Sequence, residues 1–210
     1  MTVTALVLAA GRSRRMGAAK AFLELNGEPL LSRILRTAFV AGVDRAVVVV
    51  GSAADPKLAS RAAVQELLAD RHPTLANRVR VIVGEPDKTP IDSIRAGLRE
   101  VEAGSAVLLW PVDHPFAERD LVHDLIERLA GTPDRIALPS LGGRGGHPVL
   151  LGADVVRELT SPAADRGADA VVNRDRLRLC HVEVRDPRLF AALNTPDEAA
   201  ALAVRLPVPR

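Results

Sequence analysis

Four nearly continuous apolar runs constrain the fold of this chain more than any other feature. They cover residues 3–10, 45–50, 79–83 and 106–112. Runs of this length without polar alternation are typical of parallel strands that are buried on both faces of a sheet. The sequence therefore predicts an α/β protein in which these four strands are central and helices cover both faces of the sheet.

Apolar residues at helical spacing fill several of the intervals between the strands. Residues 30–39 and 121–129 show this period, as does an alanine-rich stretch at 53–71. Four prolines stand where a first helical turn would begin, a position that does not need the missing N–H; they are Pro29, Pro56, Pro90 and Pro196.

The pattern changes after residue 135. Strand-like segments at 136–141, 149–151 and 177–184 replace the long apolar runs, and the last segment slips in its alternation near Cys180. We interpret the slip as a β-bulge. We expect a single Rossmann-like domain over residues 1–210, with three α/β/α layers and a mixed, mostly parallel sheet.

Composition narrows the class of partner. The formal net charge is only +2, aromatic residues make up 2% of the chain, and there is no tyrosine, so neither a basic tract nor base-stacking platforms are available for nucleic acid. No apolar run approaches the ~20 residues that span a bilayer. The single cysteine excludes an intramolecular disulfide. These features predict a cytoplasmic protein that binds neither nucleic acid nor membrane.

A cationic, glycine-containing loop follows the first apolar run. Residues 8–20 hold Gly11, Gly17 and four cations. Glycine allows the backbone to approach a ligand, so its N–H groups can bind phosphate oxygens while Arg15 and Lys20 add charge. The alternative is a solvated turn with scattered arginines. The Walker pattern does not fit, because it needs a lysine directly after the second glycine and here Ala18 follows Gly17. The dinucleotide-binding pattern does not fit either, because Ser13 stands where its second glycine belongs.

One further position suits a hard cation, and a later segment predicts a helix cap. Asp113 emerges from the apolar run at 106–112, where its carboxylate could hold Mg²⁺, although it could equally cap a helix or turn the chain. The segment at 194–198 reads Asn-Thr-Pro-Asp-Glu, which predicts a capping box with Thr195 as N-cap and Glu198 as its partner.

The loop resembles the signature L-A-A-G-x-S-x-R-M-G-x-x-K of nucleotidyltransferases that join a nucleoside triphosphate to a phosphorylated acceptor and release pyrophosphate. Blocks at 111–115, 143–151 and 194–198 agree in order. The chain is most similar to the MobA-like group, and within it to molybdenum cofactor cytidylyltransferases. The resemblance implies a nucleotide-binding half at 1–115 and an acceptor-binding half at 116–210.

The resemblance also implies roles for individual residues. Lys20, Arg15 and Asp113 would be catalytic, and Asp113 and Asn194 would bind Mg²⁺. The alanine at position 10, where guanylyltransferases tend to have glycine, favours CTP. The remaining expected substrate-binding residues are Leu8, Ala9, Ala10, Gly11, Arg12, Ser13, Ser93, Arg144 and His147. Ser93 is equally well explained as a helix-start residue, and His147 as a structural histidine.

The acceptor remains open. Cytidylyltransferases of this group usually show G-D-x-G-A-R, whereas residues 164–169 end in Asp169. An aspartate is the wrong charge to hold an anionic pterin phosphate. The acceptor is therefore molybdopterin or molybdenum cofactor, with a molybdoenzyme as partner, or else a sugar or other metabolite phosphate. A non-catalytic protein that delivers a nucleotide or cofactor is the third alternative.

Overall fold

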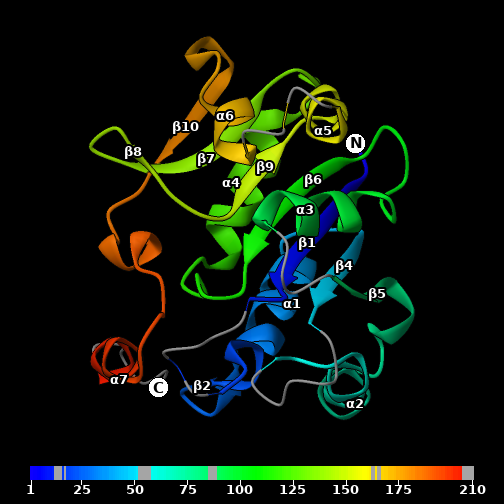
Figure 1. Cartoon of the computed structure of the whole chain (residues 1–210). Coiled ribbons are helices and arrows are strands. Elements are labelled where there is room, and N and C mark those ends of the chain that lie inside the picture. Colours follow the sequence, from blue (N-terminus) through cyan, green and yellow to red (C-terminus); the bar gives the residue numbers. More distant parts are fainter. Residues whose placement is uncertain are drawn as a thin grey trace.

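The computed structural model describes residues 1–11, 16, 18–51, 58–84, 89–161, 164 and 167–204, with the backbone alone at 203–204. An eight-stranded sheet runs through the molecule in the order β10-β7-β9-β6-β1-β4-β5, and β8 pairs with β7 (Figure 1). Its strands are β1 Val3–Ala9, β4 Arg45–Val50, β5 Val79–Val83, β6 Ala106–Pro111, β7 Ile136–Leu141, β8 Arg144–Gly145, β9 Val149–Leu151 and β10 Leu179–Glu183. A separate two-stranded ladder joins β2 Glu24–Leu25 to β3 Glu28–Pro29.

Helices cover both faces of the sheet. They are α1 Leu30–Val40, α2 Arg61–Arg71, α3 Pro90–Leu98, α4 Arg119–Leu129, α5 Ala153–Thr160, α6 Ala168–Val172 and α7 Pro196–Val204. Short 3-10 turns are η1 Lys20–Phe22, η2 Ala76–Arg78, η4 Arg176–Arg178 and η5 Pro187–Phe190. Apolar residues of α1, α2 and α4 join one core cluster, and those of α3, α5 and α6 join the other. The predicted three-layer α/β architecture is confirmed.

The sheet is mixed, as predicted. Strand β1 pairs in parallel with β4 on one side and β6 on the other. Strand β9 lies antiparallel between β6 and β7, and it is the strand that joins the two halves of the sheet. No described helix is long and apolar enough to cross a membrane.

Two expectations about the strands are wrong. Residues 79–83 form β5, but at the edge of the sheet, where Val83 is 52% exposed. Valine and isoleucine favour strands whether central or at an edge, so an apolar run does not reveal strand order. The predicted bulge near Cys180 is absent, because β10 pairs with β7 without interruption from Leu179 to Glu183. The irregular alternation instead belongs to the other edge strand, which is only partly buried.

Prolines mark three helix starts in the described chain. Pro90 and Pro196 are the first residues of α3 and α7, as predicted, whereas Pro29 is the N-cap of α1. Pro56 lies outside the described residues. At the start of α3, Thr89 and Asp92 form a capping box. Further along the helix, a Cβ at Gly97 would lie 2.2 Å from Leu6 Cδ1, so α3 packs very closely on β1.

We predict that Gly152→Ala destabilises the fold by about 1–3 kcal/mol. A Cβ at Gly152 would lie 2.2 Å from the Pro133 carbonyl oxygen, and backbone cannot rotate away. Gly145→Ala is the matched control, because its Cβ would meet Leu138 Cδ1 at 2.6 Å, the movable end of a side chain. Denaturant unfolding of both variants measures the difference. Equal losses would contradict the backbone clash.

Candidate functional site

The side chain of Lys20 joins the two predicted metal ligands. Its Nζ donates to Asp113 Oδ2 at 2.8 Å and to Asn194 Oδ1 at 2.9 Å. These partners are 93 and 174 residues away in the sequence. The structure thus brings together three of the predicted site residues, which we call the Lys20 cluster.

Neighbouring strand ends position the cluster. Lys20 opens η1, which follows the loop after β1, and Asp113 stands two residues beyond the end of β6. The Val112 N–H donates to the Leu8 carbonyl at 3.1 Å, and the Leu193 N–H donates to the Asp113 carbonyl at 2.9 Å. Because β1 and β6 pair in parallel, the start of the loop and the carboxylate both lie at the carboxyl ends of the strands, where ligands bind in α/β sheets.

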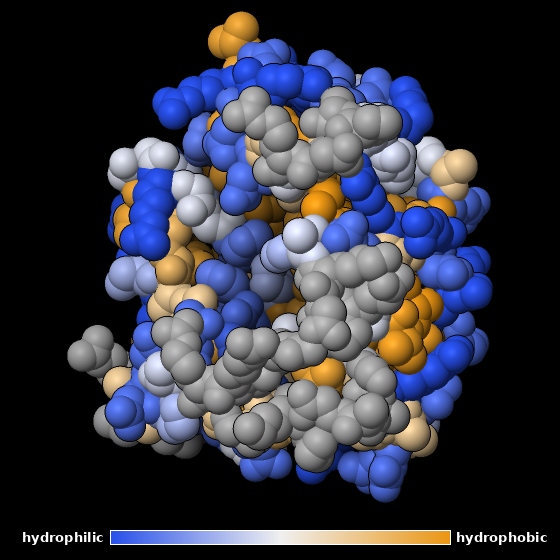
Figure 2. All heavy atoms as spheres, viewed as in Figure 1, coloured by the Kyte–Doolittle hydropathy of each residue, from blue (hydrophilic) through white to orange (hydrophobic). Residues whose placement is uncertain are grey.

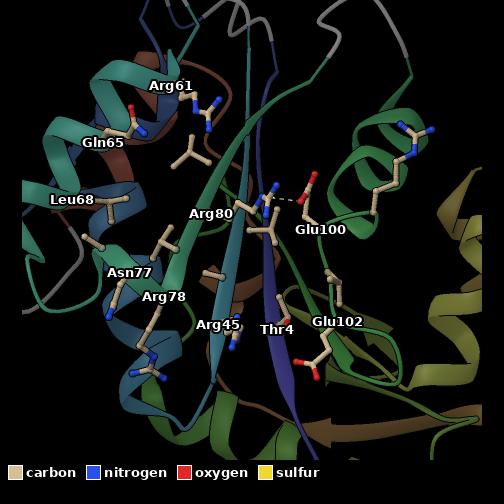
Figure 3. A pocket seen from close by; sticks show the side chains of 17 residues that line it. Thr4, Arg45, Arg61, Gln65, Leu68, Asn77, Arg78, Arg80, Glu100 and Glu102 are labelled. Atoms are coloured by element: carbon tan, nitrogen blue, oxygen red, sulfur yellow. Dashed lines mark ion pairs between the residues drawn. The ribbon is translucent and has the colours of Figure 1, made fainter.

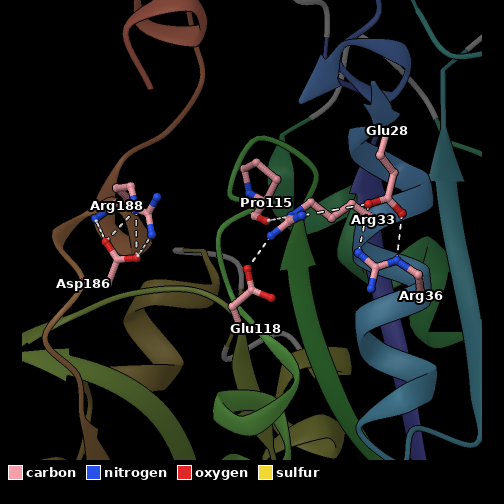
Figure 4. Close-up of polar contacts among 7 residues, drawn as sticks. All are labelled: Glu28, Arg33, Arg36, Pro115, Glu118, Asp186 and Arg188. Carbon is pink, nitrogen blue, oxygen red and sulfur yellow. Dashed lines mark hydrogen bonds and ion pairs between the residues drawn. The ribbon is translucent and has the colours of Figure 1, made fainter. Parts of the chain in front are cut away.

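The connection after β6 is held from two sides. Trp110 is fully buried, and its indole N–H donates to the His114 carbonyl at 2.8 Å. From α1, Arg33 donates through Nε to the Pro115 carbonyl at 3.1 Å and forms an ion pair with Glu118 (Figure 4). These contacts fix the backbone on both sides of Asp113, so its carboxylate is positioned by strand, helix and core together.

The capping box predicted for residues 194–198 is confirmed. The Glu198 carboxylate accepts from the N–H groups of Asn194 and Thr195 at 2.8 and 3.0 Å. The Thr195 hydroxyl accepts from the Glu198 N–H at 3.2 Å. Because the cap binds the backbone of Asn194, the side-chain oxygen of this residue is left to accept from Lys20.

Burial strengthens the Lys20–Asp113 interaction. The two side chains are only 14% and 24% exposed, so the ion pair is partly removed from water. A carboxylate oxygen and an amide oxygen, both hard ligands, converge here on one cationic atom. Mg²⁺ uses few protein ligands, so this pair fits a divalent ion. Neither here nor elsewhere do the described residues hold a group of three or more His, Cys, Asp and Glu placed to bind a metal.

Two histidines lie beside the Lys20 cluster. The rings of His114 and His147 are 4.8 Å apart, and neither Nδ1, though buried, has a hydrogen-bond partner in the described part of the chain. Burial lowers the pKa of His147 to about 4, and it also lowers the pKa of His114. Both imidazoles are therefore neutral near pH 7. Of these two histidines, the sequence analysis singled out only His147. The one sequence feature that could have identified His114 is its position next to Asp113.

The predicted nucleotide-binding residues fall partly within the described chain. Leu8 and Ala9 end β1, and Ala10 is 7% exposed in the cluster that contains Ile91 and Ile94 of α3. Ser93 is the fourth residue of that helix. A Cβ on Gly11 would meet no atom within 4 Å. Three predicted site residues lie outside the described residues, namely Arg12, Ser13 and Arg15.

Figure 2 shows a hollow near the middle of the face viewed in Figure 1, with both hydrophilic and hydrophobic side chains beside it. Residues 5–180 of the chain match the MobA-like NTP transferase domain. The chain belongs to the MobA-like NTP transferase family. It is therefore a nucleotidyltransferase, which favours catalysis over a non-catalytic delivery role.

Known proteins resemble this MobA-like transferase along most of its length. A molybdenum cofactor guanylyltransferase from Acidiphilium cryptum is 32% identical over 205 residues, 94% of this chain and 92% of the relative. A 2-C-methyl-D-erythritol 4-phosphate cytidylyltransferase from Saccharopolyspora erythraea is 33% identical over 198 residues, 91% of this chain and 75% of the relative. The crystal structure of Rv0371c from Mycobacterium tuberculosis shares the fold, with a TM-score of 0.76, 23% identity and coverage of 98% and 100% of the two chains.

Arg144 lies on a hairpin rather than in the Lys20 cluster. Gly142 and Gly143 turn the chain with φ of 58° and 83°, so β8 folds back along β7. The guanidinium of Arg144 lies 5.7 Å from the centre of the Phe190 ring. In this MobA-like transferase, residues 142 and 143 therefore form the turn between β7 and β8, and Arg144 stacks on Phe190 of η5.

A cavity of about 940 Å³ lies at the amino ends of the parallel strands, away from the Lys20 cluster (Figure 3). Its lining includes Thr4, Arg45 and Val79, which stand at the amino ends of β1, β4 and β5. An Arg80–Glu100 ion pair of 2.7 Å crosses it. Ligands of α/β sheets bind at the carboxyl ends of the strands, so this cavity is separate from the candidate active site of the transferase.

We predict that acid destabilises the metal-free protein through His147. The unfolded chain takes up this proton near pH 6.5, whereas the folded protein takes it up only near pH 4. Between these values the unfolded state binds more protons, so the stabilisation present above pH 6.5 is lost as pH falls, by up to about 3 kcal/mol. In His147→Gln the free energy of unfolding should depend less on pH. His123→Gln, on the exposed side of α4, is the control, and the same pH dependence in both variants would contradict the prediction.

Proposed function

We propose that this transferase joins CTP to a phosphorylated small-molecule acceptor and releases pyrophosphate. The observation that carries the proposal is the Lys20 cluster, in which a partly buried ammonium, a carboxylate and an amide oxygen meet beside the loop after β1. Such a group suits chemistry on phosphates, where most of the catalytic task is to position reactants and neutralise charge.

In the proposed reaction, an oxygen of the acceptor phosphate attacks the α-phosphorus of CTP in line with the departing pyrophosphate. One P–O bond forms and one breaks. The acceptor phosphate is largely ionised near neutral pH, so a general base is not required. The ammonium of Lys20 stabilises negative charge at the α-phosphate, while Arg15 and the backbone amides of residues 10–14 bind the β- and γ-phosphates.

Asp113 and Asn194 would hold a magnesium ion through Oδ2 and Oδ1, the two atoms that now accept from Lys20. When bound, the ion would neutralise phosphate charge and polarise the reacting centre. The protein would have to hold both of these oxygen atoms in place. Arg33 and Trp110 hold the Asp113 loop, and the Glu198 cap holds the backbone of Asn194.

The base is proposed to bind between the end of β1 and the first turns of α3. Leu8, Ala9, Ala10, Gly11, Arg12 and Ser13 would form one wall and Ser93 the other. Ala10 belongs to the same buried cluster as Ile91 and Ile94 of α3, so its methyl would occupy volume behind the base. This supports a smaller, pyrimidine base. The relatives include both a guanylyltransferase and a cytidylyltransferase by name, so GTP is the nucleotide to compare.

The acceptor is proposed to bind on the side of residues 116–210. His147 stands beside the Lys20 cluster and would contact the acceptor phosphate, with Arg144 farther out on the hairpin. The name of the Acidiphilium cryptum relative makes molybdenum cofactor the first acceptor to test, and its product would pass to a molybdoenzyme. Asp169 is exposed in the first turn of α6, and its charge is wrong for holding an anionic pterin phosphate. Sugar phosphates and other metabolite phosphates are therefore tested as acceptors too.

A pyrophosphate-release assay with four nucleoside triphosphates and a panel of phosphorylated acceptors tests the proposal. We expect release only when a nucleotide, an acceptor and a divalent cation are all present. Release that is independent of any acceptor would indicate hydrolysis, and no release with any pair would contradict nucleotidyl transfer to the acceptors tested.

We predict that Asp113→Asn lowers kcat by on the order of 10²-fold or more while the fold persists. The amide keeps the shape of the side chain but removes the charge that faces Lys20. Asp120→Asn, on the exposed start of α4, is the matched control and should retain full activity. Steady-state kinetics and thermal unfolding separate the two effects. Full activity of the wild-type enzyme in excess chelator would show that no divalent cation takes part.

We predict that the wild-type enzyme prefers CTP to GTP and that Ala10→Gly weakens the preference. One methyl group accounts for about 1–3 kcal/mol of discrimination, or roughly 10- to 200-fold. Measuring kcat/KM for both nucleotides in both proteins gives the change in the ratio. A wild-type preference for GTP, or a ratio that Ala10→Gly leaves unchanged, would assign base selection to another residue, with Ser93 the next to substitute.

A further inference from the structure

The ammonium of Lys20 lies between the two oxygen atoms assigned to the divalent cation. Asp113 Oδ2 and Asn194 Oδ1 both accept from it, at 2.8 and 2.9 Å. A metal ion bound to the same two oxygens would be adjacent to a positive charge in a partly buried site, where repulsion between cations is stronger than in water. Lysine and metal therefore compete for one position.

We propose that Lys20 acts as a built-in counter-ion that occupies the cation position in the free protein and is exchanged for the divalent cation when nucleotide binds. The inference rests on the proposed function for the identity of the site. It adds that the same ammonium has two successive partners, first Asp113 and Asn194, then the phosphates of the nucleotide.

The geometry allows this exchange at the side chain alone. The backbone of Lys20 is held in η1, where its carbonyl accepts from the Leu23 N–H at 3.2 Å. Four methylene groups carry the ammonium, so it can move while the backbone stays in place. Residue 17 is only three positions before Lys20 in the sequence, so the chain itself limits how far an ammonium that leaves Asp113 can be from the loop proposed to bind phosphates.

The exchange has a thermodynamic consequence. In the free protein, metal binding must displace an ammonium that makes an ion pair and a further hydrogen bond. Nucleotide phosphates give this ammonium a new anionic partner, so nucleotide should tighten metal binding, and metal should tighten nucleotide binding by the same factor. The cluster would therefore load metal and nucleotide together rather than metal alone.

Direct titration of the metal-free protein with Mn²⁺, followed by the electron paramagnetic resonance signal of free Mn²⁺, tests the competition without any turnover. Lys20→Met keeps an unbranched side chain that is one heavy atom shorter and removes its charge, and we expect it to bind Mn²⁺ at least about 10-fold more tightly than wild type. Arg80→Met is the matched control, since it also removes a cation from an ion pair, the 2.7 Å pair with Glu100, but at the amino ends of the strands. It should bind Mn²⁺ like wild type.

Equal or weaker Mn²⁺ binding by Lys20→Met would overturn the proposal, and so would the absence of Mn²⁺ binding in both proteins. Failure of the proposed function is a different result. It would be seen as missing pyrophosphate release in the assay above, and the Mn²⁺ titration does not depend on that assay.

A second measurement follows Lys20 in the wild-type chain and does not depend on Lys20→Met. The sequence contains three lysines, Lys20, Lys57 and Lys88, so selective ¹³Cε labelling gives three signals, and Lys20→Arg assigns one of them. Addition of Mg²⁺ and a non-hydrolysable CTP analogue should move the Lys20 signal to a new position, in step with the amount bound. A Lys20 signal that stays at its free-protein position at saturation would overturn the exchange.

Discussion

The carboxyl end of β1 is fixed by parallel pairing on both sides, with β4 along one edge and β6 along the other. Leu6 and Val7 are completely buried and belong to different core clusters, so a slip of one residue would move each side chain into the wrong cluster. Its last residues lead into the cationic loop. The end of β6 is paired to the same strand, and the residues that follow it carry Asp113. The position of the candidate site therefore depends on the register of these three strands.

The Lys20 cluster adds a second constraint, which links three segments that are distant in sequence. A partly buried carboxylate needs a compensating charge, and the ammonium of Lys20 supplies it while also binding Asn194. Around it, each partner is held by its own local contacts. Arg33 and Trp110 hold the loop after β6, and Glu198 caps the helix after Asn194. The polar site is thus supported by core packing, an ion pair and a helix cap.

The accuracy of the sequence-based predictions followed the range of the interactions involved. Strand and helix positions were predicted because apolar periodicity reports burial within one element, and the capping box at Thr195 involves atoms only a few residues apart. The edge position of β5 and the regular pairing of β10 were missed, because both depend on which strands lie alongside. His114 was overlooked for a similar reason. Its partner His147 is brought to it from another part of the chain.

The sequence by itself determined the α/β class, the main strands and helices, the cationic, glycine-containing composition of the loop and the residue types at the site. These are local properties, because glycine, charge and periodicity act within a few residues. Only the tertiary structure decided that β9 enters antiparallel between β6 and β7 and that Lys20 contacts Asp113 and Asn194. Those contacts depend on how whole strands and helices pack together. Asp113 and Asn194 follow Lys20 by 93 and 174 positions in the sequence, so the three meet only when the sheet has formed.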